Sequence, residues 1–216
     1  MLHLLSDTPS VVNRYVTELR NVHIQKDRMR FRHNMERIGS FIGYEISKKL
    51  TFDAVSVETP LGSATTDVYT DRIVLATILR AGLPLHNGLL HAFDEADNAF
   101  VSAYRKHHRD GTFEIEVEYL SCPDLEGATL IVSDPMLATG ASMVLATKAL
   151  LEYGKPASLH FVSAIAARLG YEYLHRHFPD ADIWIAAMDE ELTAKSYIVP
   201  GLGDAGDLSY GAKLQE

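Results

Sequence analysis

Between residues 73 and 188 the chain alternates short apolar runs with helical stretches, and this alternation constrains the fold more than any other feature. Most of the apolar runs have the length of a strand and lead through a turn into residues with helical periodicity. Parallel strands need such crossovers, because the chain must return to the same end of the sheet before the next strand begins. We therefore predict an α/β fold with an open, mainly parallel sheet and helices on both faces. The predicted strands are 73–79, 98–104, 128–132, 158–165 and 182–188, and the predicted helices run from Gly82 to about residue 92 and over 141–152 and 167–177.

The N-terminal and C-terminal segments lie outside this alternation. Residues 10–20 and 27–49 predict helices, the second because apolar residues from Phe31 to Ile46 recur at three- and four-residue spacing. The tail from 197 to 211 is rich in glycine, which predicts either a frayed end or a shaped loop. We expect these terminal segments to form a small hood beside the sheet.

Two further segments predict antiparallel pairs. Residues 53–58 and 65–69 alternate on either side of a Thr59–Gly62 turn, as a hairpin would. Residues 105–120 are polar and then alternate, which predicts an exposed two-stranded β-arm. The expected organisation is a single domain over residues 1–216, with a core of about 70–190.

Composition excludes several classes of function. The net charge of −9 opposes nonspecific nucleic-acid binding, which needs a basic face. The lone cysteine, Cys122, can form no intrachain disulfide and is expected to be an ordinary free thiol. The apolar opening of the chain is interrupted by Asp7 and Pro9, and no run approaches the ~20 apolar residues that span a bilayer. We expect a cytoplasmic protein with no membrane partner.

Residues 131–142 form the most informative segment, because a buried strand there leads through a short loop into a helix. Ligands of open α/β sheets sit at the carboxyl ends of strands, and a helix start offers unpaired N–H groups and a positive dipole end to a phosphate. Thr139 and Ser142 can add hydroxyl donors, and Asp134 can accept hydrogen bonds from ribose hydroxyls. An ordinary strand–loop–helix connection, with Thr139 or Ser142 as a helix cap, explains the segment equally well by local physics.

Residues 134–140, Asp-Pro-Met-Leu-Ala-Thr-Gly, resemble the phosphoribosyl-pyrophosphate (PRPP) motif of the type I phosphoribosyltransferases, in the single-acid form of the uracil enzymes. The resemblance extends to Leu79–Gly82, to Tyr104–Arg105 and to residues 197–207, and it covers the chain from about residue 20 to its end. Separate motifs in the same order make this resemblance far more specific than any one of them. It implies the type I phosphoribosyltransferase fold and transfer of a phosphoribosyl group to uracil, which gives UMP and pyrophosphate.

The resemblance also implies how PRPP is bound. Arg80, Ala81 and Gly82 would hold pyrophosphate, and Arg105 would reach it from a mobile arm. Asp204 would touch the substrate or its water shell, and Asp134, Arg105 and Asp204 are the predicted catalytic residues. Mg²⁺ would be carried mainly by PRPP, so no protein metal ligand is assigned. The full predicted PRPP site is Arg80, Arg105, Asp134, Pro135, Met136, Leu137, Ala138, Thr139, Gly140, Ala141, Ser142 and Asp204.

Uracil presents acceptors and a donor on one edge, and an extended backbone can match that edge with its own C=O and N–H groups. The glycine-rich tail can therefore read the base without side chains. By resemblance, Ile198, Gly203 and Ala205 supply the backbone contacts, and Asp204 lies with them. Cytosine would leave a buried group unpaired, at a cost of about 1–3 kcal/mol.

Displacement of pyrophosphate by uracil depends mainly on positioning of the reactants and on stabilisation of the departing negative charge. We therefore assign no nucleophile and no general base. The family also implies a homodimer or a higher homo-oligomer. Two departures stand out: Ala141 replaces a usual second glycine, and residues 166–170 lack a usual Pro-Glu. Alanine fits a first helical turn unless that position needs a positive φ.

Three other interpretations stay open. The first is a regulatory relative that binds uracil nucleotides and RNA, which the acidic charge and the Pro-Gly-Leu-Gly-Asp-Ala-Gly tail oppose. The second is a phosphoribosyltransferase for another base; a purine enzyme would be expected to carry paired acids before the loop. The third is a degenerate relative that folds but has no turnover.

Overall fold

A computed structural model describes the backbone of residues 1–107 and 113–213, and their side chains except within 103–117. The helices are α1 Val11–Arg20, α2 Arg28–Ser47, α3 Leu83–Leu90, α4 Ala141–Leu150, α5 Arg168–His177 and α6 Ala205–Tyr210, with short 3₁₀ turns at Leu5–Asp7 and Leu151–Tyr153. The strands are β1 Leu2–Leu4, β2 Phe52–Thr59, β3 Gly62–Tyr69, β4 Ile73–Leu79, β5 Asp97–His107, β6 Phe113–Ser121, β7 Thr129–Ser133, β8 Met136–Leu137, β9 Ser158–Ala167, β10 Asp182–Asp189, β11 Glu191–Leu192 and β12 Ile198–Val199.

The main sheet has the strand order β1-β10-β9-β7-β4-β5-β6, with β8 paired to β9. All pairings in it are parallel except that of β5 with β6, which is antiparallel. The predicted fold class is confirmed, and each of the five predicted core strands is present within a few residues of its expected bounds.

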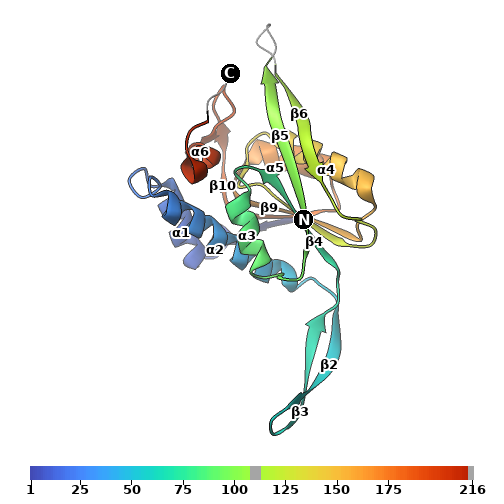
Figure 1. The fold of residues 1–216 in the computed structure, drawn as a ribbon. Coiled ribbons are helices and arrows are strands. Elements are labelled where there is room, and N and C mark those ends of the chain that lie inside the picture. Colours follow the sequence, from blue (N-terminus) through green and yellow to red (C-terminus); the bar gives the residue numbers. More distant parts are fainter. Residues whose placement is uncertain (108–112, 214–216) are drawn as a thin grey trace.

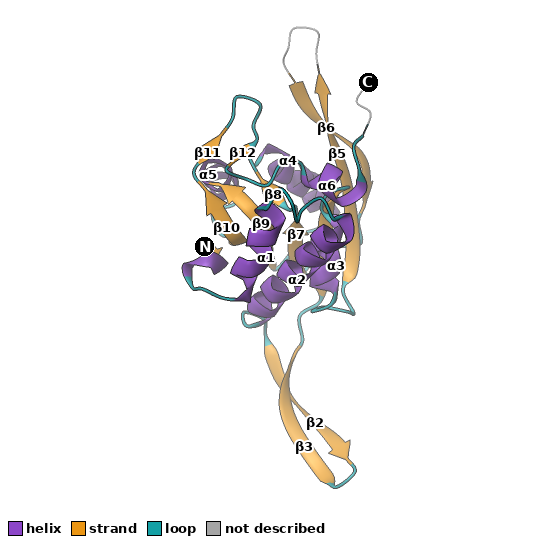
Figure 2. Cartoon of the chain, turned by 90° about the vertical axis from the view of Figure 1, so that its left-hand side faces the viewer, coloured by secondary structure: helices purple, strands orange, loops and turns teal. Residues whose placement is uncertain are grey.

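Helices cover both faces of this sheet (Figure 2). Alternate residues of each strand enter opposite cores, because successive side chains of a strand point to opposite faces. In β4, Ile73 and Leu75 pack with α1, α2 and α3, whereas Val74 and Ala76 pack with α4 and α5. Both faces of the central strands are therefore dry, which explains their continuous apolar runs. None of the helices in the described part of the chain is both long and apolar enough to cross a membrane.

Two antiparallel ribbons project from opposite ends of the molecule (Figure 1). The predicted hairpin is confirmed as β2–β3, in which Phe52 faces Tyr69 and Thr59 faces Gly62. The predicted arm at 105–120 belongs to a longer element, because β5 begins at Asp97 inside the sheet and pairs with β6 as far as Ser121. The tip of that arm, residues 108–112, lies outside the described residues.

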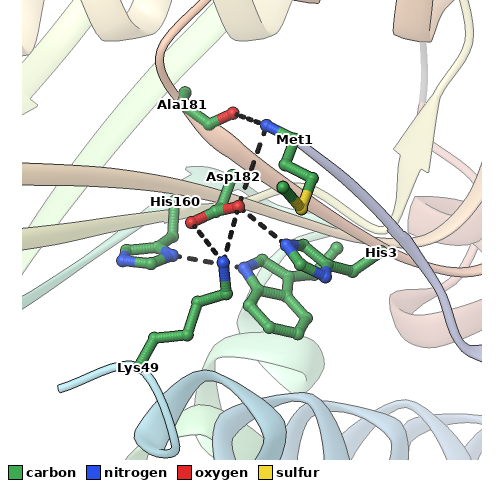
Figure 3. Close-up of polar contacts among 7 residues, drawn as sticks. Met1, His3, Lys49, His160, Ala181 and Asp182 are labelled. Atoms are coloured by element: carbon green, nitrogen blue, oxygen red, sulfur yellow. Dashed lines mark hydrogen bonds and ion pairs between the residues drawn. The ribbon is translucent and has the colours of Figure 1, made fainter.

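The N-terminus adds a strand that the sequence analysis did not predict. Leu2–Leu4 form β1, which pairs in parallel with β10 and extends the sheet. A polar cluster beside it fixes the chain end: the Met1 ammonium donates to the Ala181 carbonyl, and the His3 Nε2 lies 2.7 Å from Asp182 Oδ1 (Figure 3). Three apolar residues carry little strand signal by themselves, so this pairing depends on its distant partner.

Lys49 and Trp184 complete this cluster. Lys49 Nζ donates to both oxygens of Asp182, at 3.2 and 3.1 Å. Burial of Asp182 opposes its ionisation, but the bonds from His3 and Lys49 outweigh burial and lower its pKa. Burial also lowers the pKa of His160 from 6.5 to about 4, so its neutral ring can accept the Trp184 indole N–H at 3.2 Å. Because the unfolded state binds this proton more readily, His160 makes stability fall as pH drops from 6.5 toward 4.

Asp182 is the shared acceptor of this cluster, so its removal tests how β1 is held. We expect Asp182→Ala to lower the free energy of unfolding by about 1–3 kcal/mol, since it removes the charged acceptor that His3 and Lys49 share. Amide exchange at Leu2–Leu4 should accelerate, as measured by hydrogen–deuterium exchange alongside denaturant unfolding. Asp180→Ala, two residues away at an exposed position, is the control. Unchanged exchange in β1 of Asp182→Ala would contradict this account.

Candidate functional site

The carboxyl ends of β4 and β7 lie side by side at one edge of the sheet, and we refer to this edge as the crevice. The two strands are neighbours, with Thr77 opposite Ser133. After β4 the chain enters α3 on one face, and after β7 it enters α4 on the other. Chain connections therefore leave in opposite directions at this one place, which is where open α/β sheets bind ligands.

Hydrogen bonds join the strand ends that border the crevice. The Thr77 hydroxyl donates to the Ser133 carbonyl at 3.3 Å, and the Ser133 hydroxyl donates to the Ala76 carbonyl at 3.1 Å. The Pro135 carbonyl accepts the N–H groups of Ala164 and Ile165, at 3.1 and 3.0 Å. These contacts fix the loop after β7 against both neighbouring strands, so its position does not depend on a ligand.

The predicted phosphate loop lies between β7 and α4. Gly140 precedes the helix with φ 79°, a left-handed conformation that favours glycine. Ala141 is the first helical residue and has no positive φ, so the departure from glycine there causes no backbone strain. Thr139 Oγ1 accepts the Ala141 N–H at a long 3.4 Å, and Gly140 has no side chain with which to cap the helix. The first turn of α4 is thus weakly capped and directed toward the crevice edge.

Other members of the predicted PRPP loop turn their side chains inward. Pro135 is buried, and Leu137 packs in the core beneath α4. Met136 and Ala138 are half-buried against the opposite core. Only their backbone groups are suited to a ligand, as expected for a loop that holds phosphate through amides.

Gly170 supports this loop and was not assigned by sequence analysis. It lies in α5, and a Cβ there would collide with the carbonyl oxygens of Ala138 and Leu137. A Cβ at Gly140 would in turn lie 2.8 Å from the Gly170 carbonyl. The loop and α5 therefore touch through backbone, which explains why positions 140 and 170 have no room for a side chain.

Asp134 lies half-buried at the end of β7, beside the loop. Desolvation raises its pKa from 3.8 to about 7, and a hydrogen bond from the Met136 backbone offsets only part of that effect. Because ionisation of a buried carboxyl group is unfavourable, hydrogen bonds from donors such as ribose hydroxyls stabilise its ionised form strongly.

Arg80 is exposed and directly follows β4. Its Nη2 lies 3.5 Å from both the Asp207 carboxylate and the Gly211 carbonyl, contacts that are too long to hold it firmly. A Cβ at Gly206 would lie 3.8 Å from Ala81 Cβ, so α6 packs closely over this loop. The fold thus brings together two motifs that are more than a hundred residues apart.

The predicted uracil-reading tail is a shaped loop. Ile198 and Ala205 bury their side chains in the core, while Gly203 is exposed with φ 97°. Asp204 Oδ1 accepts the Asp207 N–H at 3.0 Å and so caps α6. Sequence analysis did not predict this cap, which gives Asp204 a structural role in the tail.

Arg105 lies in β5 opposite Ile115, but its side chain is outside the described part of the structure. Among the described residues, no group of three or more His, Cys, Asp or Glu side chains is placed to hold a metal ion.

Comparisons with known proteins agree with this geometry. The uracil phosphoribosyltransferase family matches residues 6–212, which begins earlier than the motif resemblance. A uracil phosphoribosyltransferase from Porphyromonas gingivalis is 55% identical over 206 residues, 95% of either chain. One from Thermococcus gammatolerans is 37% identical over 217 residues, 99% of this chain and 95% of its own.

Solved structures show the same architecture. A protein from Aquifex aeolicus has a TM-score of 0.88 over the full length of both chains, at 29% identity. A hypoxanthine phosphoribosyltransferase from Staphylococcus aureus, at 16% identity, has a TM-score of 0.51 over 86% of this chain and 84% of its own, and shows the shared fold alone. The family match over nearly the whole chain, together with the close relatives, establishes that this chain belongs to the uracil phosphoribosyltransferase family.

Proposed function

We propose that this protein transfers the phosphoribosyl group of PRPP to N1 of uracil and releases UMP and pyrophosphate. The observation that carries the proposal is the pairing of β4 with β7, which places the segments of Arg80 and Asp134 and the start of α4 at one edge of the sheet, with Gly206 of the tail packed against Arg80 and Ala81. Each part suits a different portion of PRPP or uracil. Family membership supports the same reaction.

In this proposal the start of α4 binds the 5′-phosphate of PRPP. The weakly capped amides and the positive end of the helix dipole favour an anion there. Asp134 accepts hydrogen bonds from the ribose hydroxyls, which compensates the burial that raises its pKa. Arg80 and Arg105 bind pyrophosphate, because guanidinium groups form forked bonds with phosphate oxygens.

Uracil is proposed to bind along the tail through the backbone of Ile198, Gly203 and Ala205, near Asp204. The burial of the Ile198 and Ala205 side chains supports this, since it fixes the backbone beside them. The exposed Gly203 lets a flat base approach closely.

Displacement of pyrophosphate at the anomeric carbon places positive charge on the sugar and negative charge on the leaving group. Fixed donors at the crevice lower this barrier without a covalent intermediate. Mg²⁺ carried by PRPP would further neutralise the pyrophosphate, and Asp204 would contact the substrate or the water bound to that ion. The protein's own residues hold both reactants in line and exclude water around them.

Product analysis tests the reaction directly. Protein is mixed with Mg²⁺, PRPP and one of uracil, cytosine, orotate or hypoxanthine, and the mononucleotides are resolved by chromatography. We expect UMP from uracil and no comparable product from the other bases. Orotidylate or IMP as the main product, or folded protein with no turnover, would refute the proposal.

Asp134→Asn tests the proposed sugar contact and its electrostatic cost. The amide oxygen preserves one acceptor but loses the charge, so we expect kcat/KM for PRPP to fall about 100-fold or more. The unfolded carboxyl ionises near 3.8 and the folded one near 7, so charging destabilises the folded apoprotein as pH rises through this window. The variant should therefore unfold at a higher temperature than the wild type at pH 8.

The stability gain of Asp134→Asn should narrow as pH is lowered toward 5, because the wild-type carboxyl is then protonated in the folded state. Thermal unfolding at both pH values, without ligand, measures this. A variant that is active, or one that is less stable than the wild type at pH 8, would contradict the role given to Asp134.

We further propose a homo-oligomer held by the β2–β3 ribbon, whose residues are almost all exposed within one chain. The pairing places Val57 with Ala64 and Val55 with Thr66 on one face, and Asp53 sits opposite Val68 there. Val55, Val57 and Val68 are 40–48% exposed. An isolated ribbon is marginal in water, so an apolar face on it favours cover by a second copy of this chain.

Charge placed on either face of the ribbon tests whether the apolar face is the one covered by a second copy. The double variant Val55→Asp and Val57→Asp should dissociate the oligomer, because the interface would then have to bury two unpaired carboxylates. Ser56→Asp with Thr65→Asp, on the opposite face, should leave it intact. Light scattering coupled to size exclusion measures both; a monomeric wild type, or equal effects of the two pairs, would disprove the arrangement.

The cytoplasm is the proposed location. The lone Cys122 is a free thiol whose pKa burial raises to about 11, as suits a chain that forms no internal disulfide.

A further inference from the structure

We propose that Arg20 and Asp189, which belong to none of the substrate motifs, are positioning residues that set the tail for uracil recognition. The inference rests on the proposed function and adds residues to its base-binding part. Arg20 is the last residue of α1, and Asp189 is the last residue of β10. They lie 169 residues apart in sequence and meet beneath Gly201.

The contacts form a closed clamp on one peptide segment. Arg20 Nη1 and Nη2 donate to Asp189 Oδ2 and Oδ1, both at 2.8 Å. Asp189 Oδ2 also accepts the Gly201 N–H at 3.0 Å, and Arg20 Nη1 donates to the Gly201 carbonyl at 3.1 Å. Both backbone polar groups of Gly201 are therefore held by one forked ion pair.

Burial makes this clamp a strong restraint. The Asp189 side chain is 7% exposed and that of Arg20 is 23% exposed, so water competes little for either group. A forked arginine–carboxylate pair also fixes orientation as well as distance. Gly201 has φ 60° and a Cβ there would collide with the Ile198 carbonyl, so the restrained position requires glycine.

A second contact extends the clamp by one residue. Gln25 Nε2 donates to the Leu202 carbonyl at 3.1 Å and to the Leu19 carbonyl at 2.7 Å. The clamp thus ends immediately before Gly203, which is exposed and is one of the proposed uracil contacts. The backbone groups of Ile198 and Gly203, which lie on either side of the clamp, are therefore ordered before uracil binds. This order lowers the entropy cost of binding the base.

The phosphate loop on the PRPP side has separate supports. It rests on β9 through the Pro135 carbonyl and on α5 through Gly170, and neither contact involves Arg20 or Asp189. Loss of the clamp should therefore affect uracil far more than PRPP. A pair that serves only general stability would show no such preference.

Steady-state kinetics of Arg20→Ala tests this, with initial rates measured against each substrate in turn. We expect the KM for uracil to rise about tenfold while the KM for PRPP changes less than about twofold, because the lost restraint lies only on the base side. Arg20→Lys retains the charge but not the fork, and should give an intermediate KM for uracil.

Arg30→Ala is the matched control. Arg30 makes a forked pair with Glu18 of α1, at 2.9 and 2.7 Å, which joins α1 to α2 rather than to the tail. This pair holds the pKa of Glu18 down at about 2, through the Arg30 and Asn34 hydrogen bonds above all. The control should lose stability like Arg20→Ala but keep both KM values.

Amide exchange of residues 198–206 supplies a readout independent of turnover. Faster exchange at Gly201 and Gly203 in Arg20→Ala, and not in Arg30→Ala, supports the clamp. Equal changes in both KM values, an unchanged KM for uracil, or unaltered exchange in folded Arg20→Ala would each overturn it. If the wild type makes no UMP, the proposed function fails by itself, while the exchange measurement still judges the clamp.

Discussion

The site depends on one constraint, the side-by-side position of β4 and β7 with their helices leaving to opposite faces of the sheet. Parallel strands end at the same edge, so Arg80 and Asp134 are brought close without any local sequence link. Divergence of α3 and α4 then leaves room between the strand ends. Hydrogen bonds from the Thr77 hydroxyl to the Ser133 carbonyl and from the Ser133 hydroxyl to the Ala76 carbonyl maintain this spacing.

At Asp134 the fold gives up some stability of the ligand-free protein, because an ionised carboxylate is buried where a ligand can later donate hydrogen bonds to it. Desolvation raises its pKa to about 7, so the ionised group is unfavourable until ligand donors reach it. Nearby, Gly140 and Gly170 allow backbone to approach backbone, which directs the amides of the phosphate loop. Apolar side chains such as Leu137 anchor the loop from below. The loop is consequently ordered before substrate binds. The change that we expect on substrate binding is loss of the Asp134 proton.

The opposite side of the crevice is built differently, from a tail with little regular structure. Its rigidity comes from Arg20, Asp189 and Gln25 on elements outside the tail. Capping of α6 by Asp204 fixes the following turn. Backbone that reads a base must be held by groups other than those that contact the base, and this arrangement satisfies that requirement.

The sequence by itself determined the strands β4, β7, β9 and β10 and the long helix α2, because their apolar periodicity is a local property. It also identified the loop at 134–140 and the tail, since glycines and an acid at fixed spacing are legible without a structure. The short β1 escaped it, because Leu2–Leu4 become a strand only by pairing with β10.

The tertiary structure alone decided the supporting residues. Arg20, Asp189 and Gly170 look ordinary in sequence, and each acquires its role from a partner far along the chain. It also decided that Asp204 caps a helix and that Ala141 needs no positive φ. The physical reason is common to all of them: local pattern fixes backbone conformation, whereas burial, pKa and hydrogen-bond partners depend on which distant segments the fold brings together.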